Sequence, residues 1–267
     1  MSGAAADPVR HFGRQVKKAR LARGWTVREA GRQLGYDDAQ VSRVENGNRP
    51  PTEGFAKACD RVWPERNGWF LDYYNESREW LATPPWFRPW LPIEAAATEL
   101  RDWQNDVVPG LLQREDYARA VLSIAPGVTP EVVGERVTAR MARQSVLMRE
   151  GLAAWFLVSE VALRTVAGSP DVTADQMEHL QTVSSLPAVT IQVVPSGVLH
   201  CGMSGACTVA TGGAYVETAF GGMVFEDTPT VQGLLRRFDT IRAQAWAAPE
   251  SLNVIRRIRD EHRQRVA

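Results

Sequence analysis

The chain has 267 residues, which is long for one domain and short for three, so the length predicts two domains. Its apolar fraction of 44% is that of a globular protein with a buried core. No segment approaches the roughly 18 consecutive apolar residues that a membrane-spanning helix needs. The N-terminus lacks the apolar core of a signal peptide, and three cysteines are too few for a disulfide scaffold, so a cytoplasmic protein with reduced thiols is expected.

The charges are unevenly distributed, although 31 basic residues balance 31 acidic ones overall. Residues 1–70 contain 13 Lys or Arg and 8 Asp or Glu, so this part carries a net charge of +5 and the remainder −5. Within residues 10–34 there are eight basic residues and a single acid, Glu29. This distribution indicates that a polyanionic partner would bind the N-terminal part and not the remainder. Solvated helices that are rich in Arg have the same composition, so the charge alone is weak evidence.

Four short helices are predicted in the first 62 residues, because each has a start signal and an amphipathic pattern. The start signals are the capping side chains of Asp7, Thr26, Asp37 and Thr52. Asp7 is followed by Pro8 at the first helical position, and Thr26 forms a capping box with Glu29. The first three helices end at Gly24, Gly35 and Gly47. Two short helices joined by a glycine turn form a helix-turn-helix, so an all-helical domain of four or five helices is expected over residues 1–74.

The spacing of glycines, caps and apolar residues in this domain is similar to that of the Cro/CI-type (XRE) helix-turn-helix repressors. The segments that carry the resemblance are Gly24-Trp25-Thr26, Leu34-Gly35 and VSRVENG at 41–47. One departure is Ala30-Gly31, where the family usually has Leu-Ala; Gly31 still allows a close approach of two helices, and Ala30 fills less of the core. The resemblance implies a DNA-binding domain whose third helix, from Asp37 to Asn46, is the recognition helix.

The recognition helix of such a domain enters the major groove with its N-terminal half toward the base edges. The positions that match the family's base-contacting residues are Asp38, Ala39 and Arg43. Arg43 is the strongest candidate, because a guanidinium can bond both acceptors of a guanine, with a discrimination of about 1–3 kcal/mol. Asp38 departs from the Gln, Ser or Thr of the family, and a carboxylate there either accepts from a cytosine or repels phosphates. Expected contacts to the DNA backbone are Gln40, Asn48, Arg49, Lys17 and Arg28.

Other residues of the third helix have expected structural roles. Val41 and Val44 are predicted to lie in the core, and Asp37 is predicted to cap the helix. Glu45 matches the family's buried partner of Arg20, so the resemblance implies an ion pair that fixes the third helix against the first.

Residues 75–92 are predicted to join the two domains, after a short helical connector at 69–81. The segment TPPWFRPWLP at 83–92 combines four prolines with three aromatic residues, and Pro-rich segments are stiff and extended. The aromatic residues either contact a ligand or a second copy of the chain, or hold the joint against the C-terminal domain. The last interpretation is favoured.

An α+β domain is predicted over residues 93–267, because short β-rich segments occur among amphipathic helices. The expected strands are 152–159, 189–195, 206–211, 214–220 and 223–226. Helices are expected at 94–105, 129–150, 160–168, 173–186, 230–246 and 249–264. A further helix is expected within 107–122, after the Pro-Gly turn of that segment. Arg136, Arg140 and Arg143 repeat at helical spacing; this stripe is interpreted as solvated pairs with Glu131 and Glu135 rather than as a second nucleic-acid contact.

Five segments of this region resemble, in the same order, the DUF5753 domain, which follows an XRE-type domain in many actinobacterial regulators, including WhiJ-like and antitoxin-like ones. They are VVPGLLQREDYARAVL, ERVTARMARQ, SEVALR, VTIQVVP and PESLNVIRRI, and the similarity spans residues 85–260. The resemblance implies a transcription regulator, often paired with a small DUF397-type partner.

The best candidate for catalysis or metal binding is PSGVLHCGMSGAC at 195–207, with Glu217 on a nearby strand. Cys201 and His200 could form a nucleophile and base, and Cys207 could add a third zinc ligand. However, neighbouring side chains on an extended strand point to opposite faces, and no fourth zinc ligand is suitably spaced. The sequence also lacks a Gly-rich phosphate loop, so no enzyme, no metal and no cofactor are expected.

Taken together, these features predict a sequence-specific transcription regulator that binds a palindromic operator in double-stranded DNA as a homodimer. One short recognition helix reads few base pairs, so two-fold pairing is expected, through the C-terminal domain. That domain is expected to sense a small-molecule effector or a protein partner. The alternative is an antitoxin-like protein-binding module whose main role is a complex with a small DUF397-type protein.

Overall fold

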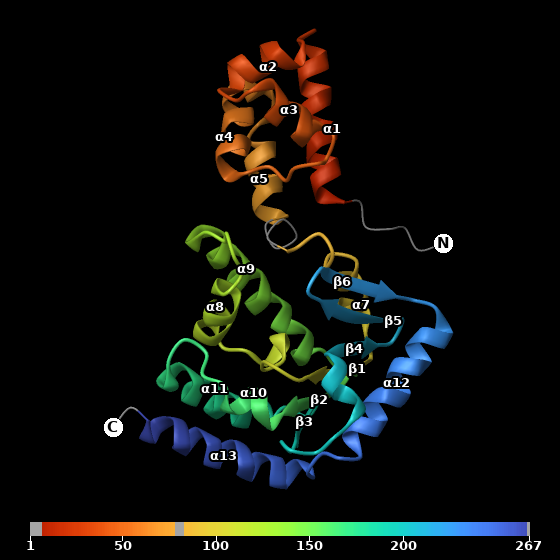
Figure 1. The fold of residues 1–267 in the computed structure, drawn as a ribbon. Coiled ribbons are helices and arrows are strands. Elements are labelled where there is room, and N and C mark those ends of the chain that lie inside the picture. Colours follow the sequence, from red (N-terminus) through yellow and green to blue (C-terminus); the bar gives the residue numbers. More distant parts are fainter. Residues whose placement is uncertain (1–6, 78–82, 266–267) are drawn as a thin grey trace. The chain divides into compact units, whose positions relative to one another are not determined.

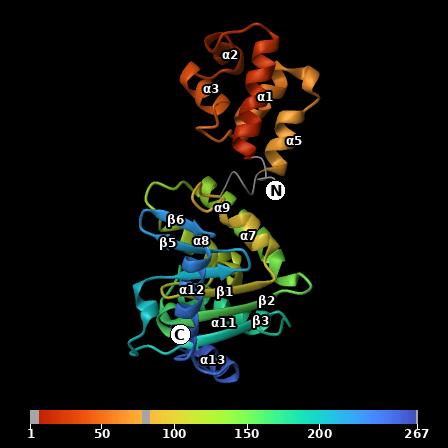
Figure 2. The same cartoon turned by 90° about the vertical axis from the view of Figure 1, so that its right-hand side faces the viewer.

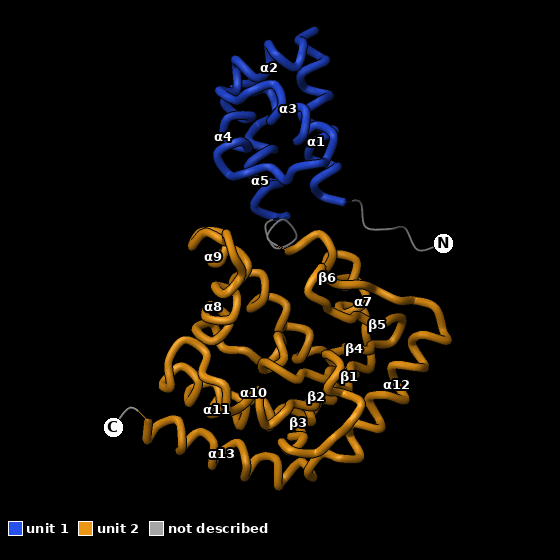
Figure 3. The backbone as a smooth tube through the Cα atoms, in the orientation of Figure 1, with its two compact units in different colours: residues 1–82 blue, residues 83–267 orange. Residues whose placement is uncertain are grey.

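The computed structural model describes residues 7–77 and 83–265 of the chain (Figure 1). The chain divides into two compact units, which are called unit 1 (residues 1–82) and unit 2 (residues 83–267) (Figure 3). The division falls inside the predicted joint 75–92. Residues 78–81, the last part of the predicted connector helix, lie outside the described residues.

Unit 1 is a bundle of short helices, as the sequence predicts. Its elements are α1 (Pro8–Ala22), α2 (Val27–Leu34), α3 (Asp38–Glu45), α4 (Glu53–Val62), the 3₁₀ turn η1 (Pro64–Arg66) and α5 (Trp69–Glu76). The four predicted N-caps are confirmed, because the side chains of Asp7, Thr26, Asp37 and Thr52 each accept a backbone N–H of the first turn. These bonds satisfy N–H groups that helix geometry leaves free, which fixes where each helix starts.

The core of unit 1 takes apolar side chains from all five α-helices. They include Phe12, Leu34, Val41, Phe55 and Phe70. The start of α5 is fastened to α4 by the carboxylate of Asp60, which accepts the backbone N–H groups of Phe70 and Leu71. The close approach expected at Gly31 is confirmed, because an added Cβ would lie 2.6 Å from the carbonyl oxygen of Tyr36. The neighbour is the turn before α3.

Unit 2 contains a six-stranded mixed sheet in the order β3-β2-β1-β4-β5-β6. The strands are β1 (Glu99–Gln104), β2 (Ala153–Ser159), β3 (Val189–Val194), β4 (Cys207–Ala210), β5 (Gly213–Thr218) and β6 (Gly221–Phe225). β1, β2 and β3 are parallel, and β4, β5 and β6 extend the sheet antiparallel from β1. Strands among helices confirm the predicted α+β class.

Helices cover both faces of this sheet. The helical elements are α7 (Trp90–Ala96), η2 (Gly110–Leu112), α8 (Glu115–Ser123), α9 (Pro130–Arg143), η3 (Gln144–Met148), α10 (Glu160–Arg164), α11 (Pro170–Val183), η4 (Cys201–Ser204), α12 (Thr228–Arg242) and α13 (Ala248–Gln264). One face packs against α11 and α13 through residues that include Phe156, Ile191 and Ile255. The other face packs against α12, which lies in front of the sheet in Figure 2, through Trp103, Leu157 and Phe238.

The helix predicted at 94–105 is wrong, and the single helix predicted at 129–150 is too long. The first segment contains the end of α7 and then β1, which pairs with β2 on one edge and β4 on the other. This strand is decided by partners far away in the sequence, which a local apolar pattern does not reveal. In the second segment, α9 ends at Arg143 and the short 3₁₀ helix η3 follows.

The proline-rich segment at 83–92 is not extended, in contrast to the prediction. The N–H of Phe87 donates to the carbonyl of Pro84, and that of Trp90 donates to Phe87, so the segment turns directly into α7. Trp90 is buried in the core of unit 2 and Phe87 packs against it. The interpretation that these aromatic residues hold the segment against the C-terminal domain is therefore confirmed for both.

Candidate nucleic-acid interface

The turn between α2 and α3 depends on Gly35, whose φ of 81° lies in the left-handed region that favours glycine. The N–H groups of Gly35 and Tyr36 both donate to the carbonyl of Gly31 at 2.9 Å, which closes the end of α2. Asp37 then caps α3 by accepting the N–H of Gln40 at 2.6 Å. The helix-turn-helix geometry is thus set by local hydrogen bonds.

Helix α3 has a buried face and an exposed face. Val41, Val44 and Glu45 are buried against the rest of unit 1. Asp38, Ala39 and Arg43, the three predicted base contacts, are all exposed. Figure 2 shows α3 at the outside of the bundle, beside α1 and α2, with which it packs. The structure therefore brings the three candidates together on one accessible helix.

The carboxylate and guanidinium on this exposed face make bonds within α3 itself. Asp38 Oδ1 accepts the N–H of Ala39 at 2.9 Å, so its carboxylate supports the positive end of the helix together with Asp37. Arg43 Nε donates to the carbonyl of Ala39 at 3.2 Å and lies along the helix. The Ala39 carbonyl lies within the helix and Arg43 is exposed, so the guanidinium can turn toward DNA without leaving a buried group unpaired. Asp38 has a local role that explains an acid at this position.

Arg20 and Glu45 form a buried, two-pronged ion pair between α1 and α3. Arg20 Nε lies 2.6 Å from Glu45 Oε1, and Nη2 lies 2.8 Å from Oε2. A third N–H of Arg20 donates to the carbonyl of Trp25 at 2.7 Å. The hydrogen bond with Glu45 raises the pKa of Arg20, against the effect of burial. A pair this well satisfied fixes the orientation of α3 and leaves neither charge unpaired.

The predicted backbone contacts lie around α3 rather than on one element. Asn48 and Arg49 are exposed just beyond its end, where their N–H groups donate to the carbonyl of Arg43. Gln40 is half-buried on α3, while Lys17 on α1 and Arg28 on α2 are exposed. All five stay candidates for phosphate contacts, because none of their side chains is buried in the core.

One positioning residue escaped the sequence interpretation. Gly13 on α1 is buried against the end of α3, where an added Cβ would lie 2.2 Å from the carbonyl oxygen of Val44. Only glycine permits this approach of α1 to the recognition helix. The available signal was a glycine in the interior of a predicted helix, directly after Phe12 and three residues before Val16.

The comparisons with protein families agree with both halves of this architecture. A family described as a helix-turn-helix domain matches residues 11–63, which include α1 to α4. A second family, described as a domain of unknown function (DUF5753), matches residues 87–257. The chain belongs to the DUF5753 family. Its N-terminal part is a helix-turn-helix domain. No curated protein and no solved structure matches the chain significantly.

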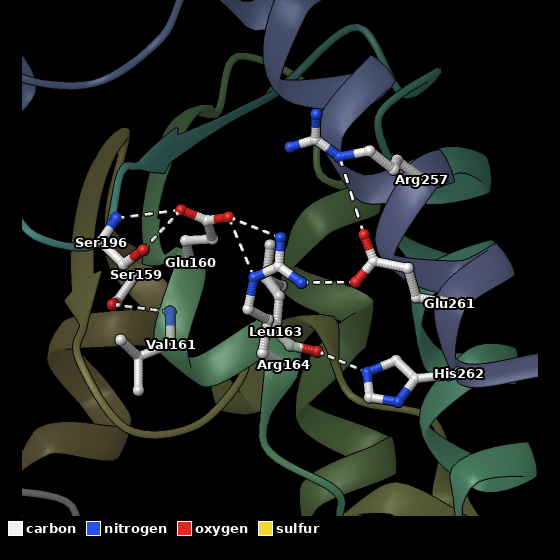
Figure 4. Close-up of polar contacts among 9 residues, drawn as sticks. All are labelled: Ser159, Glu160, Val161, Leu163, Arg164, Ser196, Arg257, Glu261 and His262. Carbon is white, nitrogen blue, oxygen red and sulfur yellow. Dashed lines mark hydrogen bonds and ion pairs between the residues drawn. The ribbon is translucent and has the colours of Figure 1, made fainter. Parts of the chain in front are cut away.

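One of the segments that carry the DUF5753 resemblance, SEVALR at 159–164, lies in a polar network drawn in Figure 4. Glu160, at the start of α10, accepts hydrogen bonds from the N–H and hydroxyl of Ser196 and from Arg164. Arg164 also pairs with Glu261 of α13, and His262 Nε2 donates to the carbonyl of Leu163 at 2.9 Å. Burial opposes ionisation of Glu160, but these bonds lower its pKa overall. The network fastens α13 to α10 and has a structural role.

The arginine stripe of α9 is not solvated, which corrects the sequence interpretation for two of its three members. Arg143 pairs with Glu94 of α7 at 2.8 and 2.7 Å, and its side chain is only 19% exposed. Arg140 Nη1 donates to Gln113 Oε1 at 2.6 Å. Neither partner could be deduced from spacing on one helix, because both come from other elements.

The cysteines and histidine singled out in the sequence are engaged separately. His200 Nδ1 accepts the N–H of Gly202 at 3.1 Å, and its ring packs edge-on against Trp103. The exposed Cys201 donates to the carbonyl of Arg237 at 3.7 Å, whereas Cys207 is buried and burial raises its pKa to about 12. Among the described residues, no three His, Cys, Asp or Glu side chains gather where they could hold a metal ion. Within the same residues, no helix has the length and apolar character needed to cross a membrane.

Proposed function

We propose that this DUF5753 protein is a sequence-specific transcription regulator of the XRE type, which acts in the cytoplasm as a homodimer on a palindromic operator. The observation that carries the proposal is the exposed face of α3, on which Asp38, Ala39 and Arg43 lie while the Arg20–Glu45 pair fixes the helix from behind. A helix held in this way can enter the major groove with its N-terminal half toward the bases. The net charge of +5 on residues 1–70 favours association with phosphates.

The proposal is tested by selecting bound duplexes from a random DNA pool and then measuring affinity by fluorescence anisotropy at several salt concentrations. Arg43→Ala should lower the affinity for the selected operator by about 1–3 kcal/mol and leave non-specific binding nearly unchanged. Lys57→Ala on α4, which removes an exposed charge paired with Glu53, is the matched control. Equal weakening on every sequence would make Arg43 a phosphate contact, and no binding to any duplex would contradict the function.

A second candidate function is the antitoxin-like complex with a small DUF397-type protein. It is favoured by apolar side chains that unit 2 leaves in solvent, because exposed apolar residues of this size are typical of protein contact surfaces. They include Leu199, Met203, Phe220 and Met223. Co-expression with such a protein should give a complex that survives gel filtration. An Asp substitution at Phe220 should disrupt that complex without changing DNA binding.

We further propose that unit 2 is a regulatory domain without enzymatic activity. The separate engagement of His200 and Cys201 supports this, because a nucleophilic thiol needs its base within hydrogen-bond reach. Cys201 should therefore react with iodoacetamide at the rate of an ordinary exposed thiol. Fast alkylation that disappears in His200→Ala would contradict the proposal.

A further inference from the structure

The three arginines of α9 lie on one face of the helix, and that face is turned into unit 2. They are separated by four and three residues, so their side chains occupy neighbouring positions. Arg136 and Arg140 are half-buried, and the side chain of Arg143 is 19% exposed. Guanidinium groups are seldom buried unless they are paired, so the partners of each arginine decide what this arrangement does.

The three arginines differ in how fully they are paired. Arg143 uses two N–H groups on Glu94, whose carboxylate also accepts from Trp90 Nε1 at 2.9 Å, so this arginine and this acid satisfy each other. Arg140 has the neutral Gln113 as its hydrogen-bond partner. The Nε of Arg136 is buried and finds no acceptor among the described residues. The pairing therefore becomes less complete from Arg143 to Arg136.

A second buried donor that is incompletely satisfied, the Tyr215 hydroxyl beside Glu217, lies on β5. Tyr215 is 5% exposed, its ring packs edge-on against Phe87 at 4.9 Å, and its hydroxyl makes no hydrogen bond of good geometry with the described residues. The neighbouring strand leaves room for this hydroxyl only because position 222 is glycine, since a Cβ there would lie 2.1 Å from the oxygen. A phenylalanine would fill the same space without an unsatisfied group, so the hydroxyl is not explained by packing.

Packing and electrostatics connect these groups. The Phe87 ring packs edge-on against Tyr215 and lies 4.4 Å from the guanidinium carbon of Arg143, so β5 and the arginine face of α9 meet at this ring. Glu217, the exposed acid at the end of β5, raises the pKa of both Arg140 and the Tyr215 hydroxyl. Burial and the neighbouring Arg143 and Arg136 lower the pKa of Arg140 to about 10, although Glu217 and Glu94 oppose this effect. The positive charge at Arg140 is therefore incompletely compensated, and an added anion would compensate it.

We propose that Arg136, Arg140 and the Tyr215 hydroxyl bind an oxyanion, the carboxylate or phosphate group of a small ligand, between α9 and β5. The planar guanidinium is suited to this chemistry because its N–H groups match the spacing of two oxyanion oxygens. Glu217 at the margin disfavours large polyanions and selects a ligand with one compact anionic group. The ligand would be the signal to which the regulator responds. The biological meaning of the site therefore rests on the proposed function, whereas the binding of an anion does not.

The site is tested by isothermal titration of the full-length protein, without DNA, with inorganic phosphate and with acetate against sodium chloride of equal ionic strength. Two oxyanions are used because they separate a phosphate-bearing from a carboxylate-bearing ligand. At least one should bind, and Arg140→Gln and Arg136→Gln should each weaken binding about 10-fold or more, the effect of losing a charge-assisted hydrogen bond. Tyr215→Phe should weaken binding several-fold while the thermal midpoint of the free protein stays equal or rises.

Two control variants assign the binding to this site. Arg236→Gln removes an exposed arginine of α12, and Arg43→Gln removes the candidate DNA-reading arginine of unit 1; both should bind the anion as the unaltered protein does. Absence of binding by both anions, or unchanged binding in Arg136→Gln and Arg140→Gln, would overturn the proposal. Because DNA is absent, such a result would leave the DNA-binding function intact, and loss of DNA binding in a separate assay would leave the anion site intact.

Discussion

Unit 1 and unit 2 each contain a buried arginine–glutamate pair, but the two pairs have different neighbours. In unit 1, Arg20 donates to both oxygens of Glu45 and to a backbone carbonyl, and the arginine assigned to DNA, Arg43, stays on the surface. In unit 2, the satisfied Arg143–Glu94 pair is preceded along α9 by Arg136 and Arg140, whose pairing is less complete. A buried pair whose charges are matched positions a helix, whereas the incompletely paired donors beside the Arg143–Glu94 pair are the basis of the proposed anion site.

The largest effect is expected where the satisfied pair of unit 1 is broken. Glu45→Ala leaves the Arg20 guanidinium buried without a counter-charge and should destabilise unit 1 by about 3 kcal/mol. Urea denaturation monitored by tryptophan fluorescence measures the loss. Glu65→Ala, which breaks the exposed Arg23–Glu65 pair, is the control and should change little. Equal effects of both variants would remove the distinction between a positioning pair and a surface pair.

A smaller effect is expected from the glycine that lets α1 approach the recognition helix. Gly13→Ala places a Cβ against the carbonyl of Val44, so α1 and α3 must separate at a cost of about 2 kcal/mol. DNA affinity should fall with stability, because α3 loses its support. The matched control is Gly134→Ala in α9, where an added Cβ meets nothing within 4 Å and helix propensity alone should stabilise by up to about 1 kcal/mol. If Gly13→Ala stabilised the protein as much as the control, the close approach would not constrain the fold.

The smallest effect concerns a buried acid of unit 2 that has no cation bonded to it. Asp102 on β1 accepts hydrogen bonds from Gln104 and Thr208, yet burial raises its pKa to about 6. A raised carboxyl pKa means that the folded state holds its proton longer than the unfolded state, so this residue lowers stability as the pH rises from about 4 to above 6. Between pH 5 and 7.5 the loss amounts to about 1.4 kcal/mol.

Asp102→Asn isolates that contribution, because asparagine keeps the shape and does not ionise. Relative to the unaltered protein, the variant should gain about 1.4 kcal/mol in unfolding free energy when the pH is raised from 5 to 7.5. Urea denaturation at the two pH values provides the measurement. Asp239→Asn, an exposed acid on α12, should show no such relative gain. A relative gain of zero for Asp102→Asn would mean that Asp102 is already ionised at pH 5.

The two units also differ in how far the sequence predicts them. In unit 1 the starts of α1 to α4 were predicted from their capping residues, and the exposed face of α3 followed from the apolar spacing of Val41 and Val44. In unit 2 the same kind of pattern predicted a helix where β1 lies, because the hydrogen bonds of β1 are made with β2 and β4, which follow it by about 50 and 100 residues in the chain. Local signals are reliable only where the bonds that decide the structure are local.

The sequence by itself determined the helix-turn-helix, its caps and its turn, because a cap or a left-handed glycine acts on backbone groups within a few residues. It also determined that Arg43, the one arginine of α3, faces outward. Only the tertiary structure decided that the α9 arginines turn inward, that Arg143 is paired across 49 residues with Glu94, and that the Tyr215 hydroxyl is buried without a well-formed hydrogen bond to the described residues. The physical reason is that the energy of a buried charge depends on every group around it, and the fold alone brings those groups together.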